Sequence, residues 1–335
     1  MPTPDHPHPL TKGHIPLTLG HEFSGRIASV PSSSSLKKGQ AVMVDPRLFC
    51  RDCRSCNSGQ DNLCPKGGFL GLAGSSGGGG LSEYVAVEES LLHPLPENVK
   101  SESAAVIEPL AVAYHAIRTP GIDLSGLDVL ILGAGPIGYA VALMLHAENP
   151  RNILISEPTA RRKAQAEELV QRVIDPRSEN VGEVCRQVTD GKGVDIVFDC
   201  AGIQAGLNDS FDALATGGYL VEVAIWETSV SAKSSLVVQQ LIPQLVIPFW
   251  DFFKKEIRIS ISFCYNQTDF REVMKRLEQG LLELILMVKG MYAGYERMVT
   301  KRISLEDVVK EGFEELATNR DEHIKILISP TRSTS

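Results

Sequence analysis

The feature that most constrains the fold is a glycine-rich turn between an apolar run and a helical pattern. The apolar run spans 127–132, the turn at 133–138 reads Gly-Ala-Gly-Pro-Ile-Gly, and the helical pattern spans 139–146. A G-x-G-x-x-G pattern with a strand before it and a helix after it is typical of a dinucleotide-binding βα unit. The sequence therefore predicts a parallel α/β fold around this turn.

Each position of the turn has a physical role in binding a pyrophosphate. Gly133 permits the tight turn, Gly135 lets the backbone approach the phosphates, and Gly138 lets the helix pack closely on the strand. Pro136 and Ile137 open the helix, where free N–H groups and the positive end of the helix dipole attract an anion. We therefore expect all five residues to contact the cofactor.

A second apolar run, 152–156, ends in an acidic residue, Glu157. At this spacing a carboxylate accepts hydrogen bonds from the adenosine ribose hydroxyls, and it would repel a 2′-phosphate, so NAD is favoured over NADP. Arg161 and Arg162 follow and could soften this preference, although a solvated helix face also explains them. We include Arg162 among the candidate cofactor-binding residues.

Strands and helices continue to alternate after this unit. Six strands are predicted, at 127–132, 152–156, 172–175, 193–199, 218–225 and 256–262. Six strands that alternate with helices describe a doubly wound parallel sheet. Outside it, a glycine-rich loop at 67–80 is expected to lead into a strand at 81–87, and the tail is expected to hold a helix at 305–316 and a strand at 324–329.

The whole-chain composition excludes several classes of partner. The chain has 335 residues and a formal net charge of −8, which disfavours nucleic acid and anionic membranes as partners. No apolar run reaches transmembrane length, and the N-terminus lacks the apolar core of a signal peptide. We expect a cytoplasmic protein in a reducing compartment, where cysteines serve more often as metal ligands or free thiols than as disulfides.

Four of the seven cysteines lie in one polar loop with the spacing C-x₂-C-x₂-C-x₇-C. They are Cys50, Cys53, Cys56 and Cys64. Four thiolates can hold one Zn²⁺ tetrahedrally and leave no position for a substrate, which would make the site structural. The C-x₂-C-x₂-C spacing also suits an iron–sulfur cluster, and two disulfides are disfavoured by the expected compartment. The local sequence favours zinc but leaves the cluster open.

Three other residues could belong to a second metal site. His21 and Glu22 follow a glycine between apolar segments, and imidazole and carboxylate both suit Zn²⁺, although such a pair is usually only a polar pair at a strand edge. Glu108 is the one carboxylate in the apolar segment 103–117. A buried carboxylate without a partner is costly, so Glu108 faces either a cation or water at a helix N-terminus.

Taken in order, these motifs resemble the zinc-dependent medium-chain alcohol dehydrogenases, and within them the butanediol and sorbitol dehydrogenase branch. The motifs are Gly20-His21-Glu22, the four-cysteine loop, Glu108-Pro109-Leu110 and the glycine turn. Segments 4–9, 294–298 and 321–325 are especially similar to fungal 2,3-butanediol dehydrogenases. The resemblance covers nearly the whole chain.

The resemblance implies a GroES-like, mainly β catalytic domain over 1–106, to which 285–335 returns, and a Rossmann NAD-binding domain over 107–284. It implies a structural zinc on the four cysteines and a catalytic zinc on His21 and Glu108, with Glu22 as an alternative or outer ligand. Zinc would then act as a Lewis acid on a secondary alcohol, diol or polyol while hydride passes to NAD. The family also suggests a homo-oligomer.

Two departures from the family pattern are visible. The family begins with a Cys-Gly-x-Cys-Gly-like motif whose first cysteine binds the catalytic zinc and is followed by a proton-relay hydroxyl, whereas no cysteine precedes Cys50 here. We therefore expect a catalytic domain that is incomplete at its N-terminus. Segment 229–246 fits no part of the pattern and is expected to be an insertion near the nicotinamide end. A gene-model error would explain both.

Three functions are compatible with these observations. The leading one is an NAD-dependent zinc alcohol or polyol dehydrogenase with a small-molecule substrate. The second is a catalytically inactive protein that keeps NAD and zinc binding but lacks the catalytic cysteine. The third is a zinc-independent quinone or enone reductase, against which the cysteine loop, His21, Glu22 and Glu108 argue.

Overall fold

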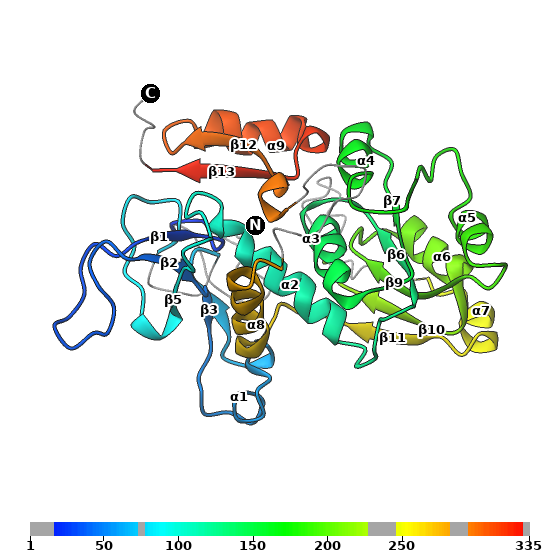
Figure 1. Cartoon of the computed structure of the whole chain (residues 1–335), viewed down its shortest axis with the longest axis horizontal. Helices are drawn as coiled ribbons and strands as arrows, with labels where there is room; N and C mark the ends of the chain where they lie inside the picture. The colour runs from blue at the N-terminus through cyan, green and yellow to red at the C-terminus, as the bar shows by residue number, and fades with distance from the viewer. Residues whose placement is uncertain (1–16, 73–77, 227–245, 282–293, 331–335) are drawn as a thin grey trace, which may run out of the picture. The chain divides into compact units, whose positions relative to one another are not determined.

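The structure is a computed structural model that describes residues 17–72, 78–226, 246–281 and 294–330. The chain divides into two compact units, one formed by residues 1–115 and 263–335 and the other by residues 116–262. Each unit has sheets of its own (Figure 1). Of the expected insertion at 229–246, residues 229–245 lie outside the described residues.

The unit of residues 116–262 is built on a six-stranded sheet in which all neighbouring strands are parallel. Across the sheet the order is β11 (Arg258–Ile261), β10 (Leu214–Glu222), β9 (Val194–Asp199), β6 (Asp128–Leu132), β7 (Asn152–Ser156) and β8 (Arg172–Ile174). The chain runs outward from β6 to β8 and then restarts beside β6 at β9. This reversal creates the switch point at which doubly wound folds bind ligands. The predicted Rossmann sheet is confirmed.

Helices cover both faces of this sheet (Figure 1). They are α3 (Pro136–Leu145), α4 (Ala160–Ala166), α5 (Val181–Val188), α6 (Gln204–Ala213) and α7 (Phe249–Lys254). On one face Leu130 and Val197 share a core with Phe211 of α6. On the other face α3 packs so closely that a Cβ added at Gly138 would lie 3.4 Å from Ile131. Burial on both faces explains why every residue of β6 is buried.

The other unit combines helices with small sheets, and its strands all lie within the residues for which a mainly β domain was predicted. β1 (Ser24–Arg26), β2 (Ala41–Val44) and β5 (Leu92–Pro94) form an antiparallel sheet, β3 (Arg47–Leu48) pairs with β4 (Gly68–Phe69), and β12 (Val299–Ser304) runs parallel to β13 (Lys325–Ser329). Phe23, Val44, Leu70 and Leu91 form a core cluster beneath these strands.

Helices complete this unit. They are α1 (Arg54–Asn57), α2 (Ile107–Arg118, of which residues 107–115 belong here), α8 (Gln267–Glu278) and α9 (Glu315–Thr318). Short 3-10 helices are η1 (Asp61–Leu63), η2 (Glu89–Leu91), η3 (Ala104–Val106), η5 (Tyr295–Met298) and η7 (Arg320–Glu322) here, and η4 (His146–Glu148) in the other unit. Among the described helices, none has the length and apolar character needed to cross a membrane.

The boundaries of the two units differ from those expected. Residues 107–115 and 263–281 were expected in the nucleotide-binding domain, but in the structure they belong to the other unit. Side-chain hydrogen bonds explain why both segments join the β-rich unit. His115 Nδ1 of α2 lies 2.6 Å from Asp269 Oδ2 of α8, and the Asn98 side chain donates to the Leu277 carbonyl over 2.8 Å. These bonds tie α2 and α8 to each other and to the chain that follows β5.

Two expected elements have a different form. The strand predicted at 81–87 is wrong, because these residues form bends and extended chain that pair with no strand among the described residues; the Leu81 N–H donates to the Leu19 carbonyl (2.9 Å). The helix predicted at 305–316 begins later, as a π-helix, η6 (Val308–Glu314), that runs into α9. Gly312 lies on its inner side, where an added Cβ would be 3.2 Å from Ile303 of β12.

Candidate metal and nucleotide sites

The four cysteines of the polar loop converge around one point. The Sγ–Sγ distances are 3.5 Å for Cys53–Cys56, 3.6 Å for Cys50–Cys64, 3.9 Å for Cys50–Cys56 and 4.0 Å for Cys53–Cys64. Four sulfurs bound tetrahedrally at 2.3 Å from one zinc ion would lie about 3.8 Å apart. The donor set therefore fits a single zinc ion, whereas a cluster would spread the thiolates over several irons.

Backbone N–H groups of the loop donate to two of these sulfurs, Cys53 Sγ and Cys64 Sγ. Cys53 is the N-cap of α1, and its Sγ accepts from the Cys56 N–H over 3.5 Å; this bond contributes most to lowering the pKa of Cys53 to about 7. The Cys50 N–H donates to Cys64 Sγ over 3.4 Å. Such N–H···S bonds stabilise negative charge on sulfur and fix the ligands around a metal.

A buried arginine anchors the cysteine loop to its unit. Arg47 is 3% exposed and forms ion pairs with Asp45 and with Asp61, which opens the short helix before Cys64. Its guanidinium also donates to the Tyr265 carbonyl (2.6 Å) and lies over the Tyr265 ring. The ion pairs and hydrogen bonds of Arg47 offset the desolvation penalty of keeping these charges buried.

The second candidate metal site brings together His21, Glu22 and Glu108. One ligand atom from each residue lies within 4.8 Å of the others. Glu108 comes from the first turn of α2, and His21 and Glu22 come from the chain that leads into β1. No cysteine belongs to this group within the part of the chain that the structure describes. The arrangement offers one nitrogen and two carboxylates to a cation, with room for a further ligand.

Burial shapes the charges of this group. Glu108 is 4% exposed, and burial first, then the neighbouring Glu22, raises its pKa to about 8. Burial also lowers the pKa of His21, so its imidazole is neutral and able to bind a metal. A carboxylate that is costly to ionise beside a neutral imidazole fits a divalent cation, which would favour the ionised form.

Glu22 has a partner that the sequence analysis did not identify. Lys325 of β13 forms an ion pair with Glu22, with side-chain exposures of 14% and 24%. Burial opposes ionisation of Glu22, but Lys325 and His21 together outweigh it and hold the pKa below its usual value. Lys325 lies in the segment that resembles the fungal enzymes, yet no local pattern shows that it meets Glu22, 303 positions earlier.

The glycine turn has the shape expected of a phosphate cradle. Gly133 has φ of +86°, and a Cβ added at Gly138 would lie 1.9 Å from the Gly133 carbonyl oxygen, so neither position accepts a larger residue easily. At Gly135, by contrast, an added Cβ would meet only Arg162 Nη1, at 3.7 Å. The open space over Gly135, at the N-terminus of α3, fits the pyrophosphate of a dinucleotide.

Glu157 lies at the end of β7, where the sequence placed it. It is 3% exposed; its Oε2 accepts from the Ala134 N–H and its Oε1 from the Thr159 N–H, both over 2.8 Å. The carboxylate therefore also fixes the glycine turn to the loop before α4. Each oxygen keeps a lone pair with which it could accept from a ribose hydroxyl.

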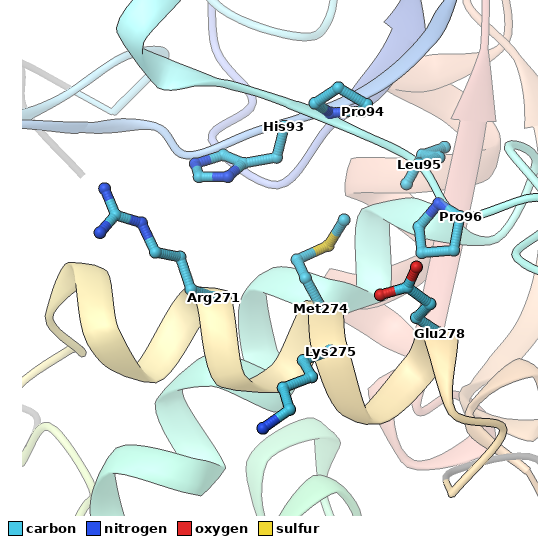
Figure 2. A pocket seen from close by; sticks show the side chains of 8 residues that line it. All are labelled: His93, Pro94, Leu95, Pro96, Arg271, Met274, Lys275 and Glu278. Atoms are coloured by element: carbon cyan, nitrogen blue, oxygen red, sulfur yellow. The ribbon is translucent and has the colours of Figure 1, made fainter.

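A surface groove between β5 and α8 is separate from both metal sites. It has a volume of about 360 Å³ and is lined by His93, Pro94, Leu95, Pro96, Arg271, Met274, Lys275 and Glu278. Figure 2 shows His93 and Arg271 at one end and Glu278 beside Pro96 at the other. The His93 ring packs on Phe270 at 4.8 Å. The groove contains none of the expected site residues.

Comparisons with known proteins agree with these sites. Residues 5–97 match the alcohol dehydrogenase GroES-like domain, and residues 136–279 match the zinc-binding dehydrogenase family. The chain is 32% identical to the (R,R)-butanediol dehydrogenase of Neisseria gonorrhoeae, over 98% of this chain and 85% of that protein. It is also 32% identical to the (R,R)-butanediol dehydrogenase of Bacillus subtilis, over 97% and 84%.

A solved structure gives the same result. The crystal structure of 2R,3R-butanediol dehydrogenase from Bacillus subtilis superposes with a TM-score of 0.80 and 33% identity, over 99% of this chain and 85% of that chain. Sequence motifs, sheet order and relatives therefore agree, and the chain belongs to the zinc-dependent medium-chain alcohol dehydrogenase family, in its butanediol dehydrogenase branch.

Proposed function

We propose that this chain oxidises a secondary alcohol, diol or polyol, with a vicinal diol such as 2,3-butanediol as the model substrate, and transfers the hydride to NAD. The observation that carries the proposal is the convergence of His21, Glu22 and Glu108 in one partly buried group. The names of the most similar relatives support the diol as substrate class. In the reaction, the carbinol carbon gives a hydride to the nicotinamide ring and the hydroxyl gives up a proton, which yields a ketone and NADH.

His21 and Glu108 are the proposed catalytic-zinc ligands. Zinc bound there would supply a Lewis acid that favours the alkoxide form of the alcohol. His21 offers a neutral nitrogen because burial lowers its pKa, and Glu108 brings its carboxylate from the first turn of α2. Glu22 is the proposed outer partner, because the ion pair with Lys325 already holds its carboxylate beside the two ligands.

The proposed cofactor site is the C-terminal edge of the parallel sheet. Gly133, Gly135, Pro136, Ile137 and Gly138 would hold the pyrophosphate, and Arg162 lies over the same turn. Glu157 would accept from the adenosine ribose hydroxyls, which supports NAD over NADP. The four cysteines are the proposed structural zinc site, with no position left for substrate.

A homo-oligomer is part of the proposal. β11 is an edge strand of the parallel sheet, and Ile261 on it is 76% exposed. On α7, Phe249, Trp250 and Phe253 are each more than 60% exposed. Among the described residues no strand pairs with the free edge of β11, and such an edge near exposed aromatic side chains is more typical of an interface than of a free surface. Light scattering of the purified chain is expected to give at least twice the monomer mass. A cytoplasmic location is also proposed, because cysteines that serve as metal ligands are typical of a reducing compartment.

A second candidate function is supported by one observation. The described His21 group contains no thiolate, although the family's catalytic zinc has a cysteine ligand. A protein that binds NAD and zinc but catalyses no hydride transfer would have this site. It would act through cofactor or partner binding.

The test is a turnover assay on zinc-loaded protein. (R,R)-2,3-butanediol and NAD are supplied, and NADH absorbance is followed for the wild type and for His21→Gln. We expect the wild type to produce NADH and His21→Gln to produce none. If the wild-type protein binds NAD and zinc but produces no NADH from diols or polyols, the chain is the inactive binding protein.

A further inference from the structure

Asp175, the residue that follows β8, holds two cations from different elements. Its Oδ2 lies 2.5 Å from Lys163 Nζ of α4 and 2.8 Å from Arg177 Nη2, and its Oδ1 accepts from Arg177 Nε over 3.0 Å. The Arg177 backbone N–H also donates to Oδ1, over 3.1 Å. Both carboxylate oxygens are therefore used by cations, and Asp175 itself is only 18% exposed.

This ion cluster lies beside the ribose end of the proposed cofactor site. Ser156 of β7 is opposite Ile174 of β8, and the Glu157 N–H donates to the Ile174 carbonyl over 3.0 Å. Asp175 comes directly after the last residue of β8, so it lies next to Glu157 at the end of the sheet. Lys163 follows Arg162, which lies over Gly135. The cluster and the ribose acceptor share one corner of the sheet edge.

The charges of this corner would suit a 2′-phosphate if the acid were absent. A lysine and an arginine are the side chains that most often bind phosphate, the arginine through two parallel donors. Here the arginine's Nε and Nη2 both donate to Asp175, and the lysine ammonium faces the same carboxylate. Arg177 and Lys163 in turn hold the pKa of Asp175 well below its usual range, so the acid stays ionised.

Glu157 is not the only charged group that bears on the expected preference for NAD. Its two oxygens each accept a backbone N–H, which spreads part of the negative charge that would repel a 2′-phosphate. Two basic side chains within the same corner would oppose that repulsion. A second acid that keeps them occupied makes the discrimination stronger, since specificity depends on penalties against the wrong ligand.

We propose that Asp175 is a specificity-determining residue that disfavours NADP by holding Lys163 and Arg177 in ion pairs. The inference rests on the proposed NAD site. It assigns the discrimination to two acids: Glu157, which meets the ribose, and Asp175, which removes the cations that a 2′-phosphate would need.

The experiment measures the affinity of the full-length chain for ADP and for 2′,5′-ADP by calorimetry. These ligands differ by the phosphate at issue and need no zinc or substrate. The variant is Asp175→Asn, which keeps an acceptor for the Arg177 N–H but removes the charge. Its affinity for 2′,5′-ADP is expected to rise roughly tenfold, as for one new charge-assisted phosphate contact, with ADP affinity changed less than about threefold.

Two controls accompany this variant. Asp212→Asn breaks a comparable ion pair, Asp212 with Arg186 at 3.0 Å, away from the C-terminal ends of β7 and β8, and is expected to leave both affinities unchanged. Asp175→Asn in a chain that also carries Lys163→Ala and Arg177→Ala is expected to give no gain for 2′,5′-ADP. A thermal melt of each variant confirms that the fold is retained.

The outcomes separate the inference from the proposed function. Wild-type binding of ADP together with the selective gain supports the inference. Two results overturn the inference and leave the NAD site intact, provided that the wild type binds ADP. In the first, Asp175→Asn does not change the ratio of the affinities for 2′,5′-ADP and ADP. In the second, the affinity for 2′,5′-ADP rises even when Lys163 and Arg177 are replaced. If the wild-type chain binds neither nucleotide, the proposed NAD site is wrong and the inference falls with it.

Discussion

The two candidate metal sites of the β-rich unit are built in opposite ways. The four cysteines come from one 15-residue stretch, Cys50 to Cys64, and the loop backbone itself donates to their sulfurs. The group of His21, Glu22 and Glu108 draws on the chain before β1 and on α2, and β13 supplies its cation, Lys325. One site is local in sequence and uniform in chemistry, and the other is assembled by the fold.

This difference indicates which property each site controls. A local loop that is closed by a metal stabilises the structure, and four thiolates leave no place for substrate. A mixed set of neutral imidazole and carboxylates keeps a position open and can change the charge of a bound alcohol. We therefore expect the loss of a cysteine ligand to affect stability most, and the loss of His21 or Glu108 to affect activity most.

The largest expected effect is on activity. His21→Gln is expected to lower kcat/KM for diol oxidation by at least about a thousandfold, because the proposed catalytic zinc would lose its only nitrogen ligand among the described residues. Initial rates of NADH formation measure this. The matched control is His93→Gln, at a half-buried histidine of the β5–α8 groove, which should change kcat/KM less than about threefold. Equal losses of kcat/KM in His21→Gln and His93→Gln would contradict the role of His21 as a ligand of the catalytic zinc.

The second effect is on stability. Cys56→Ser is expected to remove one zinc ion per chain and to lower the free energy of unfolding by about 3 kcal/mol, because the loop loses its central cross-link. Urea unfolding followed by far-ultraviolet circular dichroism gives the value. Cys185→Ser, at a buried thiol in the other unit, should leave the zinc content unchanged. A zinc content that survives Cys56→Ser would rule out the four-thiolate site.

A smaller effect is expected from the lysine beside the second site. Lys325→Met leaves Glu22 without its cation, which is expected to lower the free energy of unfolding by about 2 kcal/mol in zinc-free protein. Zinc is expected to reduce that loss, because the cation compensates Glu22. The comparison variant is Lys100→Met, which breaks an exposed ion pair with Glu296 and should cost less than about 1 kcal/mol. If zinc does not reduce the loss of unfolding free energy in Lys325→Met, Lys325 does not act on the metal group.

The smallest effect distinguishes a carboxylate at the metal group from one outside it. Burial first, then Asp199, raises the pKa of Glu222 to about 7. A raised pKa gives a stability contribution that is complete below about pH 4.5 and is lost as the pH rises through about 7. Glu222→Gln should therefore match the wild type near pH 5 and exceed its stability by about 1–2 kcal/mol at pH 8, allowing for partial exposure.

Zinc provides the contrast for that measurement. The gain from Glu222→Gln is expected to be the same with and without zinc, because Glu222 belongs to neither described metal group. Burial also raises the pKa of Glu108, to about 8, but there a bound cation would favour the ionised form. Unfolding curves at pH 5 and pH 8, with and without chelator, test this. A zinc-dependent gain for Glu222→Gln would contradict the distinction.

The sequence predicted local features well. The glycine turn, the six parallel strands and the convergence of the four cysteines each follow from a periodic pattern or a fixed spacing, and the structure contains all three. The doubly wound order follows from the alternation of strands and helices.

Features that depend on distant partners could not be predicted in this way. Residues 81–87 have the composition of a strand but form none, because strand propensity depends on the surrounding structure and the local sequence does not contain that information. The pairing of Lys325 with Glu22, and of Lys163 and Arg177 with Asp175, depends on how β13 and β8 lie beside other elements. Charged residues at strand ends have no periodic signature, so neither cluster was visible before the fold was known.

The central claim, that this chain carries two chemically different zinc sites, is tested most directly by elemental analysis of zinc per chain. The wild type is expected to contain close to two zinc ions, and His21→Gln and Cys56→Ser close to one each. If the wild type contains one ion, which Cys56→Ser removes and His21→Gln does not, the His21 and Glu108 group holds no zinc and the account of its chemistry is wrong.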